Sequence, residues 1–350
     1  MEFVFYVIVA ILALISLILH ATYVFSSIGI KDIPNERSLH SEITKKSGGM
    51  IFVPLFLFYL LVYYYLFPAS ISNAFHLKLL ILGSIFFCVI GFLDDLYHLS
   101  PNIRLLLEFA FCFGWVFYLN PSLSLFGHLI HNHVLSILLC GFLLVFIVNL
   151  VNFMDGLDLY LVGTLFVTFI FWIIIFSQSF APYESYFILL TLLLSALSGF
   201  AFFNYPKAKL FMGDSGSLVL GFVMIAFPLL ANQESGESFE LLKVFFLFPV
   251  FWVDGVLTIS IRLFQKKNLF LAHREHLYQL LTETRLGKSG TTVLVILSNL
   301  PATIFYSLYK LNWFGSFLSE TIFILFILLL YISAYSLLRI ALFYHRKNLA

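Results

Sequence analysis

Residues 77–100 read LKLLILGSIFFCVIGFLDDLYHLS, an almost unbroken apolar run that ends on the adjacent carboxylates Asp94 and Asp95. An apolar run of about 17 residues or more can cross the hydrocarbon core of a bilayer. A chain that crosses a bilayer must satisfy its backbone polar groups internally, which leaves helices or a closed barrel. Because the run is continuous rather than alternating, the sequence predicts a membrane-spanning helix with two carboxylates at its end.

The whole chain has the composition of an integral membrane protein. Of its 350 residues, 61% are hydrophobic and 11% are charged, with a mean hydropathy of +1.02. A soluble domain carries about a quarter charged residues. We therefore expect an all-α integral membrane protein that forms a single domain over residues 1–350. The net charge of +1 gives no reason to expect a nucleic-acid partner.

Apolar runs predict about 11 membrane spans, or 10 if the short eighth run, which ends near Pro228, is tilted or broken. The predicted spans are 4–25, 50–67, 77–93, 103–119, 134–151, 159–176, 186–203, 217–231, 241–261, 291–309 and 321–344. With 11 spans the two termini lie on opposite sides of the membrane.

Basic residues give the orientation, because cytoplasmic loops carry an excess of Lys and Arg. With the N-terminus outside and the C-terminus in the cytoplasm, only Lys78, Lys243 and Lys310 of the 19 Lys and Arg residues fall on the outer side. The aspartates were not used in this assignment. All of them fall in inner segments or, for Asp254, in the inner half of a span. This clustering favours a cytoplasmic site that handles anions through a metal ion.

Polar side chains recur at every third position where the fifth predicted span ends, in VNLVNFMDGLDLY, residues 148–160. They are Asn149, Asn152, Asp155 and Asp158. At helical spacing the first three share a face. Their oxygens are hard ligands suited to Mg²⁺ or to ribose and base hydroxyls. A helix cap at Gly156 is the alternative, but it explains fewer of these side chains.

A second motif, FFNYPKAKLFMGDSGSLVLG, precedes the eighth predicted span at residues 202–221. Asp214 or Ser215 could cap that helix, and the amides of its first turn would then face an anion. A phosphate bound there would need a divalent cation for its remaining charge. A cap and a tight turn without a ligand are the alternative explanation.

Two inner loops add candidate anion contacts. AHREHLYQLL, residues 272–281, carries His273, Arg274 and His276, which could donate to a diphosphate or a sugar. In KDIPNERSLHSEITKKSGG, residues 31–49, two lysines precede a Gly-Gly pair that lets backbone approach a ligand closely. A solvated loop helix and a basic anchor segment, respectively, are the alternatives.

Two other charged features lie near the predicted spans. Arg104 and Glu108 are four residues apart at the start of the fourth span, which predicts a structural ion pair. Asp254 lies inside a span, where a charged side chain costs about 2.5–3.5 kcal/mol on insertion scales. It is therefore a functional candidate, although the sequence shows no partner for it.

Five motifs together resemble those of the polyprenyl-phosphate N-acetylhexosamine-1-phosphate transferases, glycosyltransferase family 4. In family order over about residues 31–281 they are DIPNERSLH, GFLDDLYHLSPNIRL, NLVNFMDGLDLY, NYPKAKLFMGDSGSLVLG and HREHLYQL. The HLYQ form of the last motif looks more like the members that initiate O-antigen synthesis than like the lipid I-forming translocase.

The resemblance implies transfer of N-acetylhexosamine-1-phosphate from a UDP-sugar to undecaprenyl phosphate, with release of UMP. That reaction would initiate a lipid-linked cell-surface glycan such as O-antigen. The resemblance also implies a multi-pass protein among the lipids of the bacterial inner membrane, with its site on the cytoplasmic face. The implied cofactor is Mg²⁺, with Mn²⁺ as an alternative. Whether the protein is a homodimer stays open.

The resemblance also implies roles for individual residues. Asp94, with Asp95 beside it, would be the base or the phosphate-handling carboxylate, and Asp214 would bind the metal with help from Asn149. The nucleotide-sugar contacts would be Asn152, Asp155, Asp158, Lys45, Lys46, Asn204, His273, Arg274 and His276. The chain departs from the family pattern at Leu159, where a glycine is usual, and at ITKKSGG, where the basic contact could be Lys45 or Lys46.

A lipid acceptor and a water-soluble donor must meet at the inner interface, where Asp94 and Asp95 leave the membrane. One carboxylate could accept a proton from the lipid phosphate while the other orients that phosphate or helps to hold the metal. Direct attack is favoured over a covalent aspartyl intermediate. The alternative function is a multi-pass transporter with an acidic site on the cytoplasmic side, suggested by Asp254 and the short eighth span.

Overall fold

The computed structural model describes residues 2–34, 41–67, 74–176, 184–236, 238–268, 274–310 and 319–347. Within these ranges, nine helical stretches are long and apolar enough to cross a membrane, which confirms an all-α membrane protein. They are α1 (Glu2–Phe25), α2 (Gly49–Leu66), α3 (Ala74–Tyr97), α4 (Pro101–Leu119), α5 (His133–Met154), α7 (Glu184–Asn204), α8 (Asp214–Ser235), α11 with α12 (Gly287–Leu297 and Leu300–Lys310), and α13 (Glu320–Lys347). A shorter apolar helix, α6 (Tyr160–Phe176), corresponds to the sixth predicted span.

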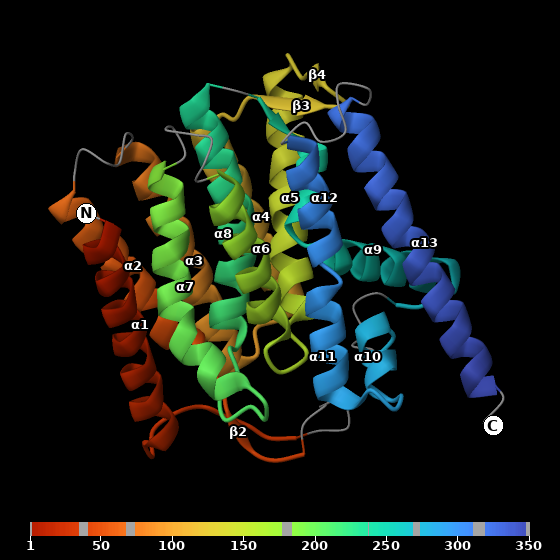
Figure 1. The fold of residues 1–350 in the computed structure, drawn as a ribbon, viewed down its shortest axis with the longest axis horizontal. Coiled ribbons are helices and arrows are strands. Elements are labelled where there is room, and N and C mark those ends of the chain that lie inside the picture. The colour runs from red at the N-terminus through yellow and green to blue at the C-terminus, as the bar shows by residue number, and fades with distance from the viewer. Residues whose placement is uncertain are drawn as a thin grey trace.

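These helices run side by side, and short strands lie at both ends of the bundle (Figure 1). At the upper end, β3 (Leu123–Leu125) pairs with β4 (His128–Leu129) and β5 (Phe239–Glu240). At the lower end, β1 (Lys31–Asp32) pairs antiparallel with β2 (Thr44–Lys45). Helices α1 and α13 run in the same direction, as expected if the termini lie on opposite sides of a membrane.

Helix α8 forms the centre of the bundle, and 89% of the residues in its apolar stretch are buried. Helices α3 and α5 pack along it, and a glycine permits the closest approach of α3. A Cβ atom on Gly91 would lie 2.3 Å from the carbonyl carbon of Asp214, so no other residue fits there without moving a helix. The packing therefore brings the end of α3 against the start of α8, where the acidic motifs meet.

The eighth predicted span, 217–231, is longer than expected, and it is neither short nor broken. Helix α8 begins at Asp214 and continues through Pro228 to Ser235. The apolar pattern excluded the polar first turn, although a carboxylate from α3 binds its amides. Proline is tolerated inside membrane helices, where neighbouring groups can satisfy the freed carbonyl.

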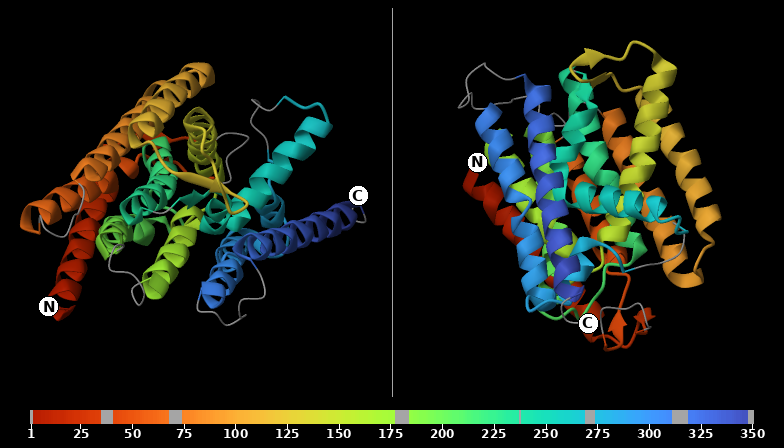
Figure 2. Two further views of the ribbon diagram at one scale, coloured as in Figure 1. Left: turned by 90° about the horizontal axis from the view of Figure 1, so that it is seen from above. Right: turned by 90° about the vertical axis from the view of Figure 1, so that its right-hand side faces the viewer.

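The prediction of one continuous span over 241–261 is wrong. A 3-10 helix, Leu241–Leu247, is followed by α9 (Pro249–Phe264). Helix α9 lies across the direction of its neighbours (Figures 1 and 2). Pro249 begins α9 at a position where its missing N–H costs nothing, and Phe248 before it has a non-helical conformation. The break turns the polar face of α9 toward α10 (Leu277–Thr282) and α13.

Candidate active site

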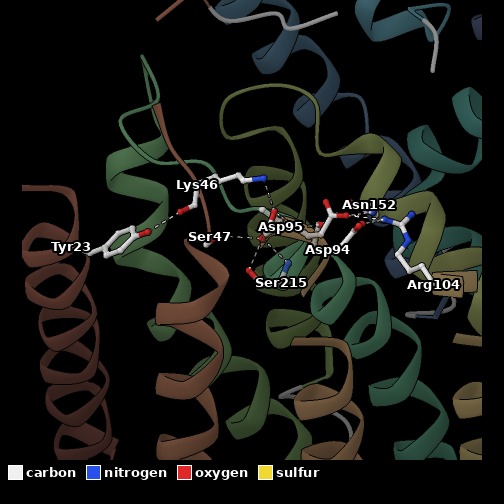
Figure 3. Close-up of polar contacts among 11 residues, drawn as sticks. Tyr23, Lys46, Ser47, Asp94, Asp95, Arg104, Asn152 and Ser215 are labelled. Atoms are coloured by element: carbon white, nitrogen blue, oxygen red, sulfur yellow. Dashed lines mark hydrogen bonds and ion pairs between the residues drawn. The ribbon is translucent and has the colours of Figure 1, made fainter. Parts of the chain in front are cut away.

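Acidic side chains from separate helix ends meet at the lower end of the bundle. Asp94 and Asp95 come from the last turn of α3, and Asp214 is the first residue of α8. Arg104 comes from α4 and Asn152 from the end of α5. Figure 3 shows the side chains of Asp94, Asp95, Arg104 and Asn152 converging on one region.

Arg104 joins the two carboxylates that are farthest apart in sequence. Its Nη1 atom donates to Asp94 Oδ2 at 2.6 Å and to Asp214 Oδ2 at 2.8 Å. Without this cation the two negative charges would repel one another at close range. The predicted ion pair with Glu108 is confirmed, with Nε 3.5 Å from Oε1. The interpretation of Arg104 as purely structural missed its second role in the acidic cluster.

Asp95 has a different environment from its neighbour Asp94. Its carboxylate accepts the backbone N–H groups of Asp214 and Ser215 at 3.3 and 3.4 Å, and the Ser47 and Ser215 hydroxyls at 3.3 Å. Only 4% of the Asp95 side chain is exposed, against 14% for Asp94. Asp95 therefore fixes the first turn of α8, whereas Asp94 faces Arg104.

Lys46, and not Lys45, is the lysine beside these acids. Lys46 Nζ lies 3.4 Å from Asp95 Oδ1. Lys45 Nζ instead donates to the carbonyls of Tyr23 and Ser26 at 2.7 and 2.6 Å, at the end of α1. Lys46 therefore lies with the acids and Lys45 at the end of α1, while a nucleotide contact of either lysine stays a prediction. Figure 3 shows Lys46 reaching toward Asp95 while its carbonyl accepts the Tyr23 hydroxyl.

The polar face predicted for the end of α5 points toward the acids. Asn152 Nδ2 lies 3.5 Å from Asp214 Oδ2, and its Oδ1 accepts the Ser217 hydroxyl at 2.9 Å. One turn earlier, Asn149 donates to the buried carboxylate of Glu108. Asn149 therefore contacts the one acid on α4, and its predicted help in holding a metal stays a prediction.

Asp155 and Asp158 follow in the loop between α5 and α6. Burial, together with the charges of Asp158 and Asp95, raises the pKa of Asp155 to about 7. Asp158 accepts the N–H of Ala208 at 3.2 Å, so it also holds the segment that leads to α8.

Asn204 connects two loops behind the acidic cluster. Its Oδ1 accepts the N–H of Leu159, and its Nδ2 donates to the carbonyl of Leu210 at 2.8 Å. Leu159 has a φ of +60°, the left-handed region that favours glycine. The departure from the family pattern therefore keeps the backbone conformation that a glycine would adopt. Both ends of the Asn204 amide contact backbone, so Asn204 braces the two loops, and its predicted nucleotide contact stays a prediction.

The histidine segment lies at the start of α10. His273 is outside the described residues, and Arg274 is partly buried. His276 is buried, with Nδ1 3.4 Å from Asp254 Oδ1. Asp254 thus has the partner that the sequence did not show. Because Asp254 is hydrogen-bonded and α8 is continuous, both features that suggested a transporter have a structural explanation.

The donor atoms at this site are of the kind that bind Mg²⁺ in proteins. The described part of the chain holds no group of three or more His, Cys, Asp or Glu side chains arranged around a metal position. Mg²⁺ does not need such a set, because proteins often bind it through one or two carboxylates plus substrate phosphates. Asp94 and Asp214 supply two carboxylate oxygens that already share one cationic nitrogen.

Comparisons with known proteins identify the family of this chain. Residues 77–232 match the model of glycosyl transferase family 4. The chain is 30% identical over 297 residues to the phospho-N-acetylmuramoyl-pentapeptide-transferase of Fervidobacterium nodosum, covering 78% of this chain and 85% of that protein. It is 26% identical to a probable undecaprenyl-phosphate N-acetylglucosaminyl 1-phosphate transferase of Bacillus subtilis. That match covers 77% of this chain and 74% of the relative. The chain therefore belongs to glycosyl transferase family 4, the polyprenyl-phosphate hexosamine-1-phosphate transferases.

Proposed function

We propose that this protein transfers an N-acetylhexosamine-1-phosphate from a UDP-sugar to undecaprenyl phosphate and releases UMP. The observation that carries the proposal is the sharing of Arg104 by Asp94 and Asp214 at one end of a membrane bundle. A lipid acceptor can keep its tail in the bilayer and bring its phosphate to that end, where a water-soluble donor can also arrive.

The reaction follows from the chemistry of the two substrates. An oxygen of the acceptor phosphate would attack the β-phosphorus of the donor, and the bond from that phosphorus to the bridging oxygen would break. The sugar-1-phosphate would then be joined to the lipid through a diphosphate, and UMP would leave. Asp94 would accept the proton that the acceptor phosphate carries. Direct attack requires no covalent bond to the protein.

The other residues would position and neutralise the reacting groups. Arg104 and Lys46 bring positive charge to a region where phosphates meet carboxylates. Asp95 would hold the first turn of α8, so that Asp214 stays beside Asp94. Asp214 would be the carboxylate that holds Mg²⁺, and the ion would supply charge neutralisation for the donor diphosphate. Positioning and charge neutralisation supply most of the catalysis in phosphoryl transfers.

The site would face the cytoplasm of a bacterium, with the protein in the inner membrane. Two observations support this orientation. Lys and Arg concentrate in the segments at the lower end of the bundle, as the distribution of positive charge in membrane proteins requires. The acidic cluster lies at the same end, and nucleotide sugars are cytoplasmic metabolites.

The product would begin a lipid-linked glycan, with O-antigen as our first candidate because of the HLYQ form of the histidine motif. The activities for which the two relatives are named suggest donors to test, UDP-N-acetylglucosamine and UDP-N-acetylmuramoyl-pentapeptide. A panel should therefore contain both of these, together with the 6-deoxy sugars UDP-N-acetylquinovosamine and UDP-N-acetylfucosamine.

The decisive experiment measures UMP release by purified protein in detergent with undecaprenyl phosphate and MgCl₂. We expect one donor of the panel to give UMP, and no UMP when the lipid is omitted or EDTA is added. The Asp214→Asn variant serves as the matched control, because it keeps the size of the side chain. Absence of UMP with every donor, from protein that unfolds cooperatively on heating, would falsify the proposal.

A further inference from the structure

Helix α9 presents three polar side chains on one face. Asp254, Thr258 and Arg262 are each four residues apart, so they lie along the same side of the helix. All three are buried, with exposed fractions of 1%, 0% and 4%. Buried charged and polar groups are costly unless they are paired, so this face must be matched by a specific partner.

Asp254 binds the first turn of α10. Its Oδ1 accepts the N–H of Leu277 at 2.8 Å, and its Oδ2 accepts the N–H of Tyr278 at 3.2 Å. The preceding N–H, that of His276, donates to the Gln279 side chain at 3.2 Å. The first three amides of this turn are therefore all fixed, two of them by a carboxylate from another helix.

The same carboxylate is oriented from its other side. Thr258 and Tyr335 both donate to Asp254 Oδ1 at 3.1 Å. Arg339 of α13 donates to the Tyr335 hydroxyl and to Thr258 Oγ1. Asp254 is thus locked between α9, α10 and α13, and it has no freedom to rotate away from α10.

Arg262 holds the residues just before α10. Its Nη1 donates to Glu275 Oε2 at 3.0 Å, and its Nη2 donates to the Asn268 carbonyl at 2.6 Å. The segment 274–278 is therefore tied to α9 at two points, one on each side of His276. His276 Nδ1 itself lies 3.4 Å from Asp254 Oδ1.

This turn also packs against the loop that carries Asp155. A Cβ atom on Gly156 would lie 2.2 Å from the Tyr278 hydroxyl oxygen, so the Tyr278 side chain fills the space beside that glycine. The Tyr278 and His276 rings are stacked, with centroids 5.8 Å apart. Fixing the backbone at 276–278 therefore fixes the stacked pair of rings and the place where Tyr278 meets the loop between α5 and α6.

We propose that Asp254 is a positioning residue for the transfer reaction, acting through His276 and Tyr278. The polar face of α9 holds the start of α10, so that His276 meets the phosphate or sugar of the donor and Tyr278 backs the loop of Asp155. The proposal rests on the proposed function, because it takes His276 as a donor contact. The structural half of the proposal, the attachment of α10 to α9, can be tested without any activity.

Hydrogen exchange of the full-length protein tests the attachment. In Asp254→Asn, an NH₂ group replaces one of the two carboxylate oxygens. Because NH₂ cannot accept a hydrogen bond from N–H, one amide at the start of α10 loses its acceptor. We expect amides 277–282 to exchange at least about tenfold faster in this variant, a loss of roughly 1.4 kcal/mol of local stability, with exchange in α8 unchanged. Ser260→Ala, on another face of α9, is the matched control. Unchanged exchange in Asp254→Asn would overturn the attachment.

A double-mutant cycle tests the action through His276. We expect Asp254→Asn and His276→Asn each to raise the KM for the UDP-sugar about tenfold, with the KM for undecaprenyl phosphate unchanged. The double variant should be no worse than His276→Asn alone by more than about twofold, and Asp254→Glu should recover part of the loss. If the two single-variant increases in the KM for the UDP-sugar multiply in the double variant, the positioning role of Asp254 is overturned. A wild-type protein without UMP release would contradict the proposed function, while the exchange result would still decide the attachment.

Discussion

Two buried aspartates each bind the first two amides of a helix, in two different regions of this protein. Asp95 does so for α8, beside the acidic cluster, and Asp254 does so for α10, beside the histidine segment. In both regions the carboxylate comes from a neighbouring helix rather than from the residue before the helix. In both, a candidate substrate-facing side chain lies at the start of the helix that is held.

The two aspartates differ in what balances their charge. Asp95 has a lysine within 3.4 Å and lies next to the second carboxylate of its own motif. Asp254 has a histidine at 3.4 Å and a tyrosine hydroxyl at 3.1 Å, deep inside a helix that crosses the bundle. One arrangement keeps a permanent cation at the place where we expect phosphates to react. The other orients a side chain whose charge depends on its protonation.

The largest expected effect separates Asp95 from its neighbour. Asp94→Asn should lower kcat/KM for UMP release by about 100-fold or more, with the melting temperature in detergent near that of the wild type. Asp95→Asn should lower both activity and melting temperature, because it leaves Lys46 and the first amides of α8 poorly paired. Identical profiles for the two variants would contradict the division of roles between these adjacent carboxylates.

The next effect concerns the cation beside Asp95. Lys46→Met removes a positive charge near the proposed phosphates and leaves the buried Asp95 carboxylate without its cation, so we expect about a tenfold loss of kcat/KM. Lys45→Met is the matched control, because Lys45 binds carbonyls at the end of α1. It should keep activity within about twofold and lower only the melting temperature, through loss of helix-end hydrogen bonds. The reverse ranking would show that the wrong lysine was chosen.

The smallest effect is a change in the pH dependence of stability. In the folded protein the pKa of Asp155 is raised from 3.8 to about 7, mainly by burial. The folded state therefore binds this proton more tightly than the unfolded state, and stability is lost as pH rises from about 4 to about 7. Asp155→Asn should melt at a higher temperature relative to wild type at pH 8 than at pH 5, without Mg²⁺ or nucleotide. An equal difference at both pH values would exclude a raised pKa for Asp155.

Much of the acidic cluster could be predicted from the sequence. The spacing of three residues in VNLVNFMDGLDLY placed Asn149 and Asn152 on one face. In the structure both side chains contact acidic groups on other helices. The position of Asp94 at a helix end also followed from the apolar pattern, and that of Asp214 followed from the polar motif before the eighth predicted span. Periodicity works here because each motif adjoins a long apolar run, whose end fixes where its polar residues lie.

The partners of these residues could not be predicted, because they come from distant parts of the chain. Arg104 has a suitable acid four residues away, which concealed its contact with Asp214, 110 residues away. The adjacent pair at 94 and 95 gives no sign of which carboxylate turns toward α8. Within FPVFWVDGVLT the proline was the one available signal of a break, but apolar residues on both sides concealed it.

The close contact of Gly91 with the backbone of Asp214 allows Asp94 and Asp214 to lie close together. Every larger residue would wedge α3 away from α8, because its first side-chain carbon would overlap the backbone at the start of α8. The displacement would increase the distance between Asp94, one turn further along α3, and Asp214 at the start of α8. A substitution of Gly91, at the buried contact between α3 and α8, would thereby disable the reaction at the acidic cluster.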